Sequence, residues 1–282
     1  MTVLTETYKL SNGVEIPKVA FGTWQIPNGD ATYNSVATAL KNGYRHIDTA
    51  KAYGNEQSVG QAIRDSGIDR KEIFVTSKLP AEIKTYDGAL KAFDETMADL
   101  DIDYLDLYII HAPWPWNQIG KNCDEGNINV WQAMEKIYAS GRVRAIGVSN
   151  FAVRDLENLL PHAKVKPMVN QIQYYVGFTE PKITSYSQEH GILIEAYSPL
   201  ATGRMLSNEK VLAIAKKYDV TPAQLAIRFC VENGVLPLPK AVTPAHIVSN
   251  KELDFTISAA DMAVLNDLQD TTDGSNHNPT QG

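Results

Sequence analysis

The feature that most constrains the fold is a repeated alternation of short β-rich runs and segments with helical periodicity. Between the runs, apolar residues recur at spacings of three and four, as at Val36, Ala39 and Leu40, which is typical of helices. Strand followed by helix, repeated without a linker, predicts a parallel (β/α)8 TIM barrel. A short N-terminal β-hairpin is expected around Asn12-Gly13. The eight runs are 19–21, 45–48, 73–77, 105–110, 143–148, 168–172, 192–197 and 235–238.

A doubly wound open sheet is the alternative to the barrel. The chain contains no GxG spacing and no GxxxxGK[ST] motif, so the dinucleotide fingerprint of that fold is absent. A length of 282 residues fits one barrel. We therefore expect a single domain over 1–282, ending in a polar tail at 271–282 that has no large apolar residue.

Charge and composition exclude several classes of protein. The 26 Lys and Arg are outnumbered by 33 Asp and Glu, for a net charge of −7, which argues against binding to nucleic acid or to anionic lipid. No apolar run approaches the roughly 18 residues that span a bilayer, and the N-terminus resembles no leader. A cytoplasmic location is expected. Cys123 and Cys230 are predicted to be free thiols, and the histidines show no HxxxH pair, so no metal site is predicted.

Polar and aromatic residues stand where the predicted strands end. In a TIM barrel the active site lies at the carboxyl ends of the strands, because the βα loops converge there. These strand ends are therefore candidate site positions. They comprise Thr23, Trp24, Asp48, Lys78, His111, Ser149, Asn150, Gln171, Tyr197 and Lys240.

Three of these side chains, Asp48, Lys78 and His111, together with Tyr53, suit the reduction of a carbonyl group. Tyr53 follows Asp48 by five residues, so its phenol is placed in the adjoining loop. An ammonium beside a phenol favours the phenolate, and Lys78 is expected to lower the pKa of Tyr53 from its usual value of about 10. Asp48 would keep Lys78 protonated, and His111 could donate a hydrogen bond to the oxygen that Tyr53 protonates.

The motifs that contain these residues resemble the aldo-keto reductases. They are Asp48-Thr-Ala-x-x-Tyr53-Gly-Asn-Glu, Lys78 after Val-Thr-Ser, and Leu-Asp-Leu-Tyr-Ile-Ile-His111. The match continues in the same order through Gly-Val-Ser149-Asn-Phe, Asn-Gln171-Ile-Gln-Tyr, Ala-Tyr197-Ser-Pro-Leu and Leu-Pro-Lys240, and covers the chain to about residue 268. Within the family the chain is most similar to short bacterial members of the 2,5-diketo-D-gluconate reductase type.

This resemblance implies an enzyme that reduces aldehydes and ketones with NAD(P)H. Tyr53 would donate the proton, Lys78 and Asp48 would adjust the acidity of its phenol, and His111 would orient a small-molecule carbonyl substrate. The resemblance also implies a monomer. The implied cofactor contacts are Thr23, Ser149, Asn150, Gln171, Tyr197, Ser198, Leu200, Lys240, Val242, Thr243, His246 and Asn250.

One departure from the family pattern bears on the cofactor. His246 stands where relatives carry an arginine that clamps the adenosine 2′-phosphate, and histidine lacks its permanent charge. NADPH is expected to be preferred over NADH by a modest factor that shrinks as the pH rises from about 6 to 8.5.

Other departures concern the substrate. Trp24, Trp114 or Trp116, and the space left by Ala112 where relatives often carry a tryptophan, predict a fairly open and partly aromatic pocket. A C-terminal lid is not expected, because the tail lacks the family's usual aromatic ending.

Three other functions remain to be weighed. Relatives on this fold can act as cofactor-sensing binding subunits, although Tyr53, Lys78 and His111 argue for catalysis. A Schiff-base aldolase would need Lys78 as an unprotonated amine, which Asp48 disfavours. The third alternative is a hydrolase. The Gly147-Val-Ser149 sequence resembles half of the nucleophile elbow of hydrolases, but the second glycine of that motif is missing.

Overall fold

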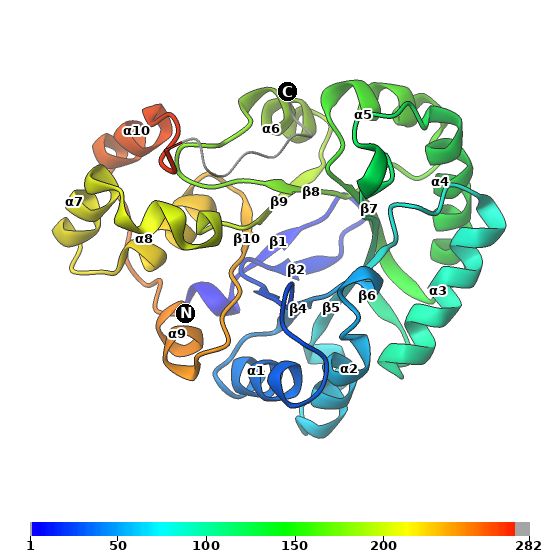
Figure 1. The fold of residues 1–282 in the computed structure, drawn as a ribbon, viewed down its shortest axis with the longest axis horizontal. Helices are drawn as coiled ribbons and strands as arrows, with labels where there is room; N and C mark the ends of the chain where they lie inside the picture. Colours follow the sequence, from blue (N-terminus) through cyan, green and yellow to red (C-terminus); the bar gives the residue numbers. More distant parts are fainter. Residues whose placement is uncertain (1, 274–282) are drawn as a thin grey trace.

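Parallel strands arranged as a barrel surround the centre of the molecule (Figure 1). The computed structural model describes residues 2–273 of the chain. The strands pair in chain order. Amides of Ala20 and Gly22 also donate to the carbonyls of Pro237 and Pro239, at 3.0 Å each, so the first and last strands are joined. The predicted TIM barrel is confirmed. Its strands are β3 (Phe21–Gly22), β4 (His46–Asp48), β5 (Phe74–Leu79), β6 (Leu105–Ile110), β7 (Val143–Ser149), β8 (Val169–Gln173), β9 (Leu193–Tyr197) and β10 (Leu236–Leu238).

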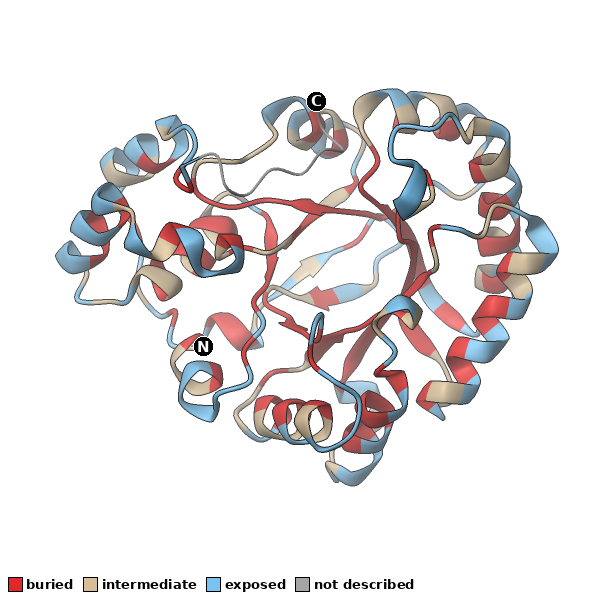
Figure 2. Ribbon diagram, in the orientation of Figure 1, coloured by how far each residue is buried: buried red, intermediate tan, exposed pale blue. Residues whose placement is uncertain are grey.

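Helices cover the outside of the barrel and bury one face against it (Figure 2). Each apolar stripe faces the strands because its residues recur at helical spacing. At the start of α8 the Thr221 hydroxyl accepts a hydrogen bond from the Gln224 backbone N–H, and the Gln224 side chain accepts one from the Thr221 backbone N–H, which together form a capping box. The helices are α1 (Asp30–Lys41), α2 (Glu56–Asp65), α3 (Tyr86–Leu100), α4 (Asp124–Ala139), α5 (Val153–Leu159), α6 (Pro181–Glu189), α7 (Glu209–Lys217), α8 (Pro222–Glu232), α9 (Pro244–Ser249) and α10 (Ala259–Asp267).

The barrel interior is a packed apolar core that is closed at one end. The predicted hairpin forms as β1 (Thr7–Lys9) and β2 (Glu15–Pro17), and Ile16 packs with inward side chains of the barrel strands, among them Phe74 and Leu107. Figure 1 shows the hairpin lying across the barrel. The amino ends of the strands are thus sealed with apolar residues, and the carboxyl ends carry the polar side chains.

The first residues of the predicted polar tail are buried against the barrel domain and do not extend into solvent. Thr271 and Thr272 are buried, and Thr271 approaches the backbone at Gly177. Residues 274–282, the rest of the predicted tail, lie outside the described residues. Within the described part of the chain, no helix is both long and apolar enough to cross a membrane.

Candidate active site

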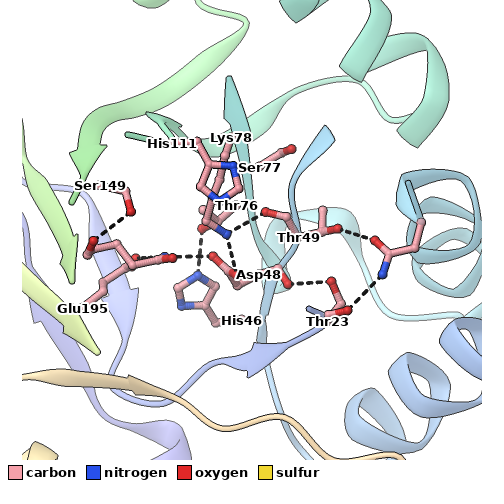
Figure 3. Close-up of polar contacts among 12 residues, drawn as sticks. Thr23, His46, Asp48, Thr49, Thr76, Ser77, Lys78, His111, Ser149 and Glu195 are labelled. Carbon is pink, nitrogen blue, oxygen red and sulfur yellow. Dashed lines mark hydrogen bonds and ion pairs between the residues drawn. The ribbon is translucent and has the colours of Figure 1, made fainter. Parts of the chain in front are cut away.

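Three polar side chains, Asp48, Lys78 and His111, converge at the carboxyl ends of β4, β5 and β6 (Figure 3), and Tyr53 lines the cavity above them from the loop after β4. Asp48 is the last residue of β4, Lys78 is the last but one of β5, and His111 directly follows β6. Tyr53 ends a short 3₁₀ turn, and Gly54 follows it with a φ of 65°, a conformation that costs glycine little. Parallel neighbouring strands thus bring together residues that are far apart in the sequence.

Lys78 is fully buried, and two oxygens accept hydrogen bonds from it. Its Nζ lies 2.6 Å from Asp48 Oδ1 and 2.9 Å from the carbonyl oxygen of Thr49. The same Nζ lies 4.9 Å from the centre of the Tyr53 ring. Burial by itself lowers the pKa of Lys78, but Asp48 and Tyr53 outweigh burial, so the net shift is upward. Lys78 is therefore a cation held in place beside Tyr53.

Tyr53 keeps its proton at neutral pH, and in this the structure corrects the sequence expectation. Burial raises the pKa of the phenol by more than the nearby Lys78 ammonium lowers it, and the net shift is upward. The sequence showed the cation but not the degree of burial. An ammonium has no acceptor, so the phenolic proton cannot pass to Lys78 and is left to be donated elsewhere. Tyr53 lines the cavity above the strands, so it is placed to act as an acid there.

His111 is a neutral hydrogen-bond donor at the same place. Burial, together with the charge of Lys78, lowers its pKa to about 3. Its Nδ1 is buried and has no hydrogen-bond partner within the described chain, which favours the tautomer with the proton on Nε2. The ring lines the cavity and meets Tyr53 edge to face, with ring centres 5.6 Å apart. An imidazole held this way can donate to a carbonyl oxygen but is a poor acid.

A cavity of about 760 Å³ opens above these residues. Polar side chains on its floor hold one another in place. Asn150 donates to the His111 carbonyl at 3.0 Å and accepts from the Tyr197 hydroxyl at 2.9 Å, while Ser149 donates to the Gln171 carbonyl at 2.8 Å. Seven of the expected cofactor contacts line this cavity, namely Ser149, Asn150, Gln171, Tyr197, Ser198, Leu200 and Lys240.

Comparison with known proteins decides the family. The model of the aldo/keto reductase family matches residues 18–270. The chain belongs to the aldo/keto reductase family. It is 42% identical to a glyoxal reductase of Bacillus subtilis, over 95% of this chain and 94% of that protein. An aldo/keto reductase structure from Brucella melitensis has a TM-score of 0.87 and 41% identity, covering 93% of this chain and 98% of the other. A Bombyx mori aldo-keto reductase in complex with NADP has a TM-score of 0.85 and 30% identity, covering 94% and 93%.

Four expected cofactor residues of this reductase lie beyond the cavity edge. Lys240 is exposed at that edge, and Val242, Thr243 and His246 follow it on the surface. Thr243 precedes α9 without a side-chain bond to the helix, and Asn250 is buried at its other end. Any contact between these residues and a cofactor therefore lies outside the main cavity.

The structure places three expected contacts of the reductase elsewhere. Thr23 is fully buried, and its hydroxyl donates to the Asp48 carbonyl at 3.0 Å, so it supports the floor without lining the cavity. Ala112 and Trp114 pack with Ala81 in a small buried cluster. Neither Ala112 nor Trp114 lines the cavity, so Ala112 does not widen the pocket as the sequence predicted.

Several cavity residues of the reductase were not singled out as site residues from the sequence. They include Trp116, which contacts His111 edge to face with ring centres 5.4 Å apart. The sequence named Trp116 only as an alternative to Trp114, since both follow prolines in one loop. No local signal separates them. The other residues of this kind are Gly22, Gln25, Ala52, Gln173, Pro199, Thr202, Gly203 and Leu238.

Replacing Trp116 should mainly weaken substrate binding, whereas replacing Trp114 should mainly destabilise the fold. Trp116 is 38% exposed and lines the cavity, whereas Trp114 is 5% exposed and does not. We expect Trp116→Ala to raise KM for aromatic aldehydes about three- to tenfold, with the free energy of unfolding changed by less than about 0.5 kcal/mol. Trp114→Ala should cost about 3–5 kcal/mol of stability. Steady-state kinetics and denaturant melts check this, and a larger KM effect for Trp114→Ala would contradict the assignment.

Proposed function

We propose that this reductase converts aldehydes and ketones to alcohols with NADPH, and that Tyr53 protonates the carbonyl oxygen. NADPH supplies the hydride to the carbonyl carbon when it is bound. The observation that carries the proposal is the fixed Lys78 ammonium beside Tyr53, with its Nζ 4.9 Å from the centre of the ring. An ammonium has no acceptor for the phenolic proton, and its charge stabilises the negative charge that the oxygen gains as the proton leaves.

His111 and Asp48 assist Tyr53 in different ways. His111 is uncharged and lines the cavity, so its Nε2–H can bind the carbonyl oxygen next to Tyr53 without competing for the proton transfer. Asp48 accepts from Lys78 at 2.6 Å and keeps the ammonium charged and in place. Together they orient the carbonyl and maintain the cation behind the acid.

The residues of the cavity fit a nicotinamide dinucleotide. Gln173 Oε1 is buried and unpartnered within residues 2–273, so the floor offers an acceptor to a ligand amide. Tyr197 presents an aromatic ring to the same space, and Lys240 places a cation at the far edge, where a phosphate would be held. Ser149, Asn150 and Gln171 would hold the carboxamide, and the Lys240–Asn250 segment the 2′-phosphate.

The structure bears on the aldolase alternative. A Schiff base needs a free amine, but the pKa of Lys78 is raised and its N–H groups are engaged. Lys78 is therefore a poor nucleophile.

The test of the proposed function is loss of NADPH absorbance with a panel of carbonyls, which should include glyoxal and aromatic aldehydes. Turnover of at least one aldehyde is expected. Binding of NADPH, seen by fluorescence, with no turnover of any carbonyl would indicate a cofactor-binding subunit. A monomer and a cytoplasmic location remain predictions. Sedimentation of the purified chain tests the first, and fractionation of cells that express it tests the second.

The cofactor preference should depend on His246. An imidazole loses its charge between about pH 5 and 8 whereas a guanidinium does not. We therefore expect a modest NADPH/NADH ratio of kcat/KM that falls as the pH rises from about 6 to 8.5. His246→Arg should raise the ratio about three- to tenfold and make it independent of pH. A wild-type ratio that is flat with pH, or an arginine variant that is no more selective, would show that His246 does not contact the phosphate.

A further inference from the structure

Beneath the cavity floor, two buried carboxyl groups share one amide. Gln171 Nε2 lies 3.0 Å from Asp48 Oδ2 and 2.8 Å from Glu195 Oε2. Glu195 is on β9, two residues before Tyr197, so both side chains point into the barrel. Figure 3 shows Glu195 and Asp48 directed toward one another. Glu195 is fully buried and does not line the cavity.

The surroundings of Glu195 do not support a second negative charge. Lys78 is the nearby cation, but its hydrogen bonds go to Asp48 and Thr49. The partner strand β8 contributes the uncharged amide of Gln171, and Leu236 of β10 pairs with Glu195 along the sheet. Glu195 Oε1 is buried and has no hydrogen-bond partner in residues 2–273. An ionised carboxylate would leave this oxygen unsolvated beside Asp48, which is costly.

We propose that Glu195 is a positioning residue for the reduction, which acts as an uncharged carboxylic acid that holds Gln171 and leaves Asp48 as the single negative charge behind Lys78 and Tyr53. Both N–H groups of Gln171 then point at carboxyl oxygens, and its Oε1 is left to accept from a ligand in the cavity. A flipped amide would set its oxygen against the ionised Asp48 carboxylate.

The charge of Glu195 has a predictable effect on the reaction. Burial, with a smaller contribution from Asp48, raises its pKa to about 8, so the group is neutral below that pH and ionises above it. An added negative charge near Tyr53 would make the phenol a weaker acid. Reduction should therefore slow as the pH rises through about 8, although Tyr53 itself stays protonated.

The test is the pH dependence of kcat, measured between about pH 6 and 9.5 at saturating NADPH and carbonyl. We expect wild-type kcat to fall about three- to tenfold from pH 7 to 9, and Glu195→Gln, which cannot ionise, to show no such fall. Glu180→Gln is the matched control. Burial also raises the pKa of Glu180, to about 7, but among residues 2–273 the side chains of Gln171 and Asp48 hydrogen-bond each other, Glu195 and Lys78 and not Glu180, so the fall should persist.

A second variant separates orientation of Gln171 from charge. Glu195→Leu also removes the ionisation, but it leaves Gln171 without its second acceptor, so KM for NADPH should rise at least about threefold. Glu195→Gln restores an acceptor and should keep KM near the wild-type value. The proposal would be overturned if kcat still fell between pH 7 and 9 in either variant, or if the two variants had equal KM values for NADPH.

Thermal unfolding provides a readout that does not depend on activity. The pKa of Glu195 in the folded protein lies above its unfolded value near 4.5. The protonated group therefore contributes fully to the free energy of unfolding below pH 4.5, and this contribution is lost as the pH rises through about 8. The Tm of Glu195→Gln should therefore increase relative to wild type across this range. No relative increase would mean that Glu195 is not held neutral.

The inference rests on the proposed role of Tyr53, and the two can fail separately. Full turnover by Tyr53→Phe would remove the proton-donor role but leave the Tm test of Glu195 intact. An inactive Tyr53→Phe with an unchanged alkaline fall in Glu195→Gln would overturn the inference on Glu195 alone.

Discussion

Tyr53→Phe is expected to lower kcat for carbonyl reduction by at least about a hundredfold while NADPH affinity stays nearly unchanged. The substitution removes only the hydroxyl, and with it the proton that the carbonyl oxygen receives, an effect of about this size for a positioned acid. The ring that contacts His111 edge to face stays in place. Steady-state kinetics and fluorescence titration of NADPH measure the two quantities separately.

The control for Tyr53→Phe is a thermal melt that shows whether the variant is folded. The Tyr53 side chain lies beside the buried Lys78 ammonium, so a small loss of stability is expected when its hydroxyl is removed, and the Tm should show that the variant is folded at the assay temperature. Retention of wild-type turnover by the folded variant would mean that another group donates the proton.

Lys78→Met is expected to reduce kcat by a similar factor and also to destabilise the fold. Without the ammonium, the departing proton leaves a phenolate with no nearby cation. The substitution also strands Asp48, which is 3% exposed, and an unpaired buried charge of this kind costs about 3–5 kcal/mol. Enzyme kinetics and chemical denaturation at about pH 7 measure both effects.

A double variant separates the catalytic effect of Lys78 from the structural one. Lys78→Met with Asp48→Asn removes both charges, so much of the lost stability should return. Activity should stay at the level of Lys78→Met, because the cation behind Tyr53 is still missing. Recovery of activity along with stability would show that Lys78 is only a structural partner of Asp48.

The order of the elements could be read from the sequence because the signals that specify it are local. Each predicted run overlaps a strand, and the run 105–110 coincides with β6 (Leu105–Ile110). Two periodicities, of two and of about 3.6 residues, distinguish strands from helices in short windows. The convergence of Asp48, Lys78 and His111 followed from them, since consecutive parallel strands end on the same side of a barrel.

Contacts between distant segments could not be read in the same way. Trp114 and Trp116 stand two positions apart in one loop, yet one is buried against Ala81 and the other lines the cavity. Thr23 ends its predicted run as Asp48 does, but its hydroxyl turns to the Asp48 carbonyl. Which way such a side chain faces depends on the space that other loops leave for it.

The sequence alone determined the barrel and the hairpin, and it singled out Asp48, Lys78 and His111 at the strand ends and Tyr53 in the adjoining loop, because periodicity and strand order are properties of short segments. The tertiary structure decided the electrostatics. Burial outweighs the Lys78 cation at Tyr53 and raises the pKa of the phenol, and it brings Glu195 and Asp48, 147 positions apart in the chain, onto one amide. A pKa depends on solvent exclusion and on distances between charges, and both arise only when all eight strands are packed together.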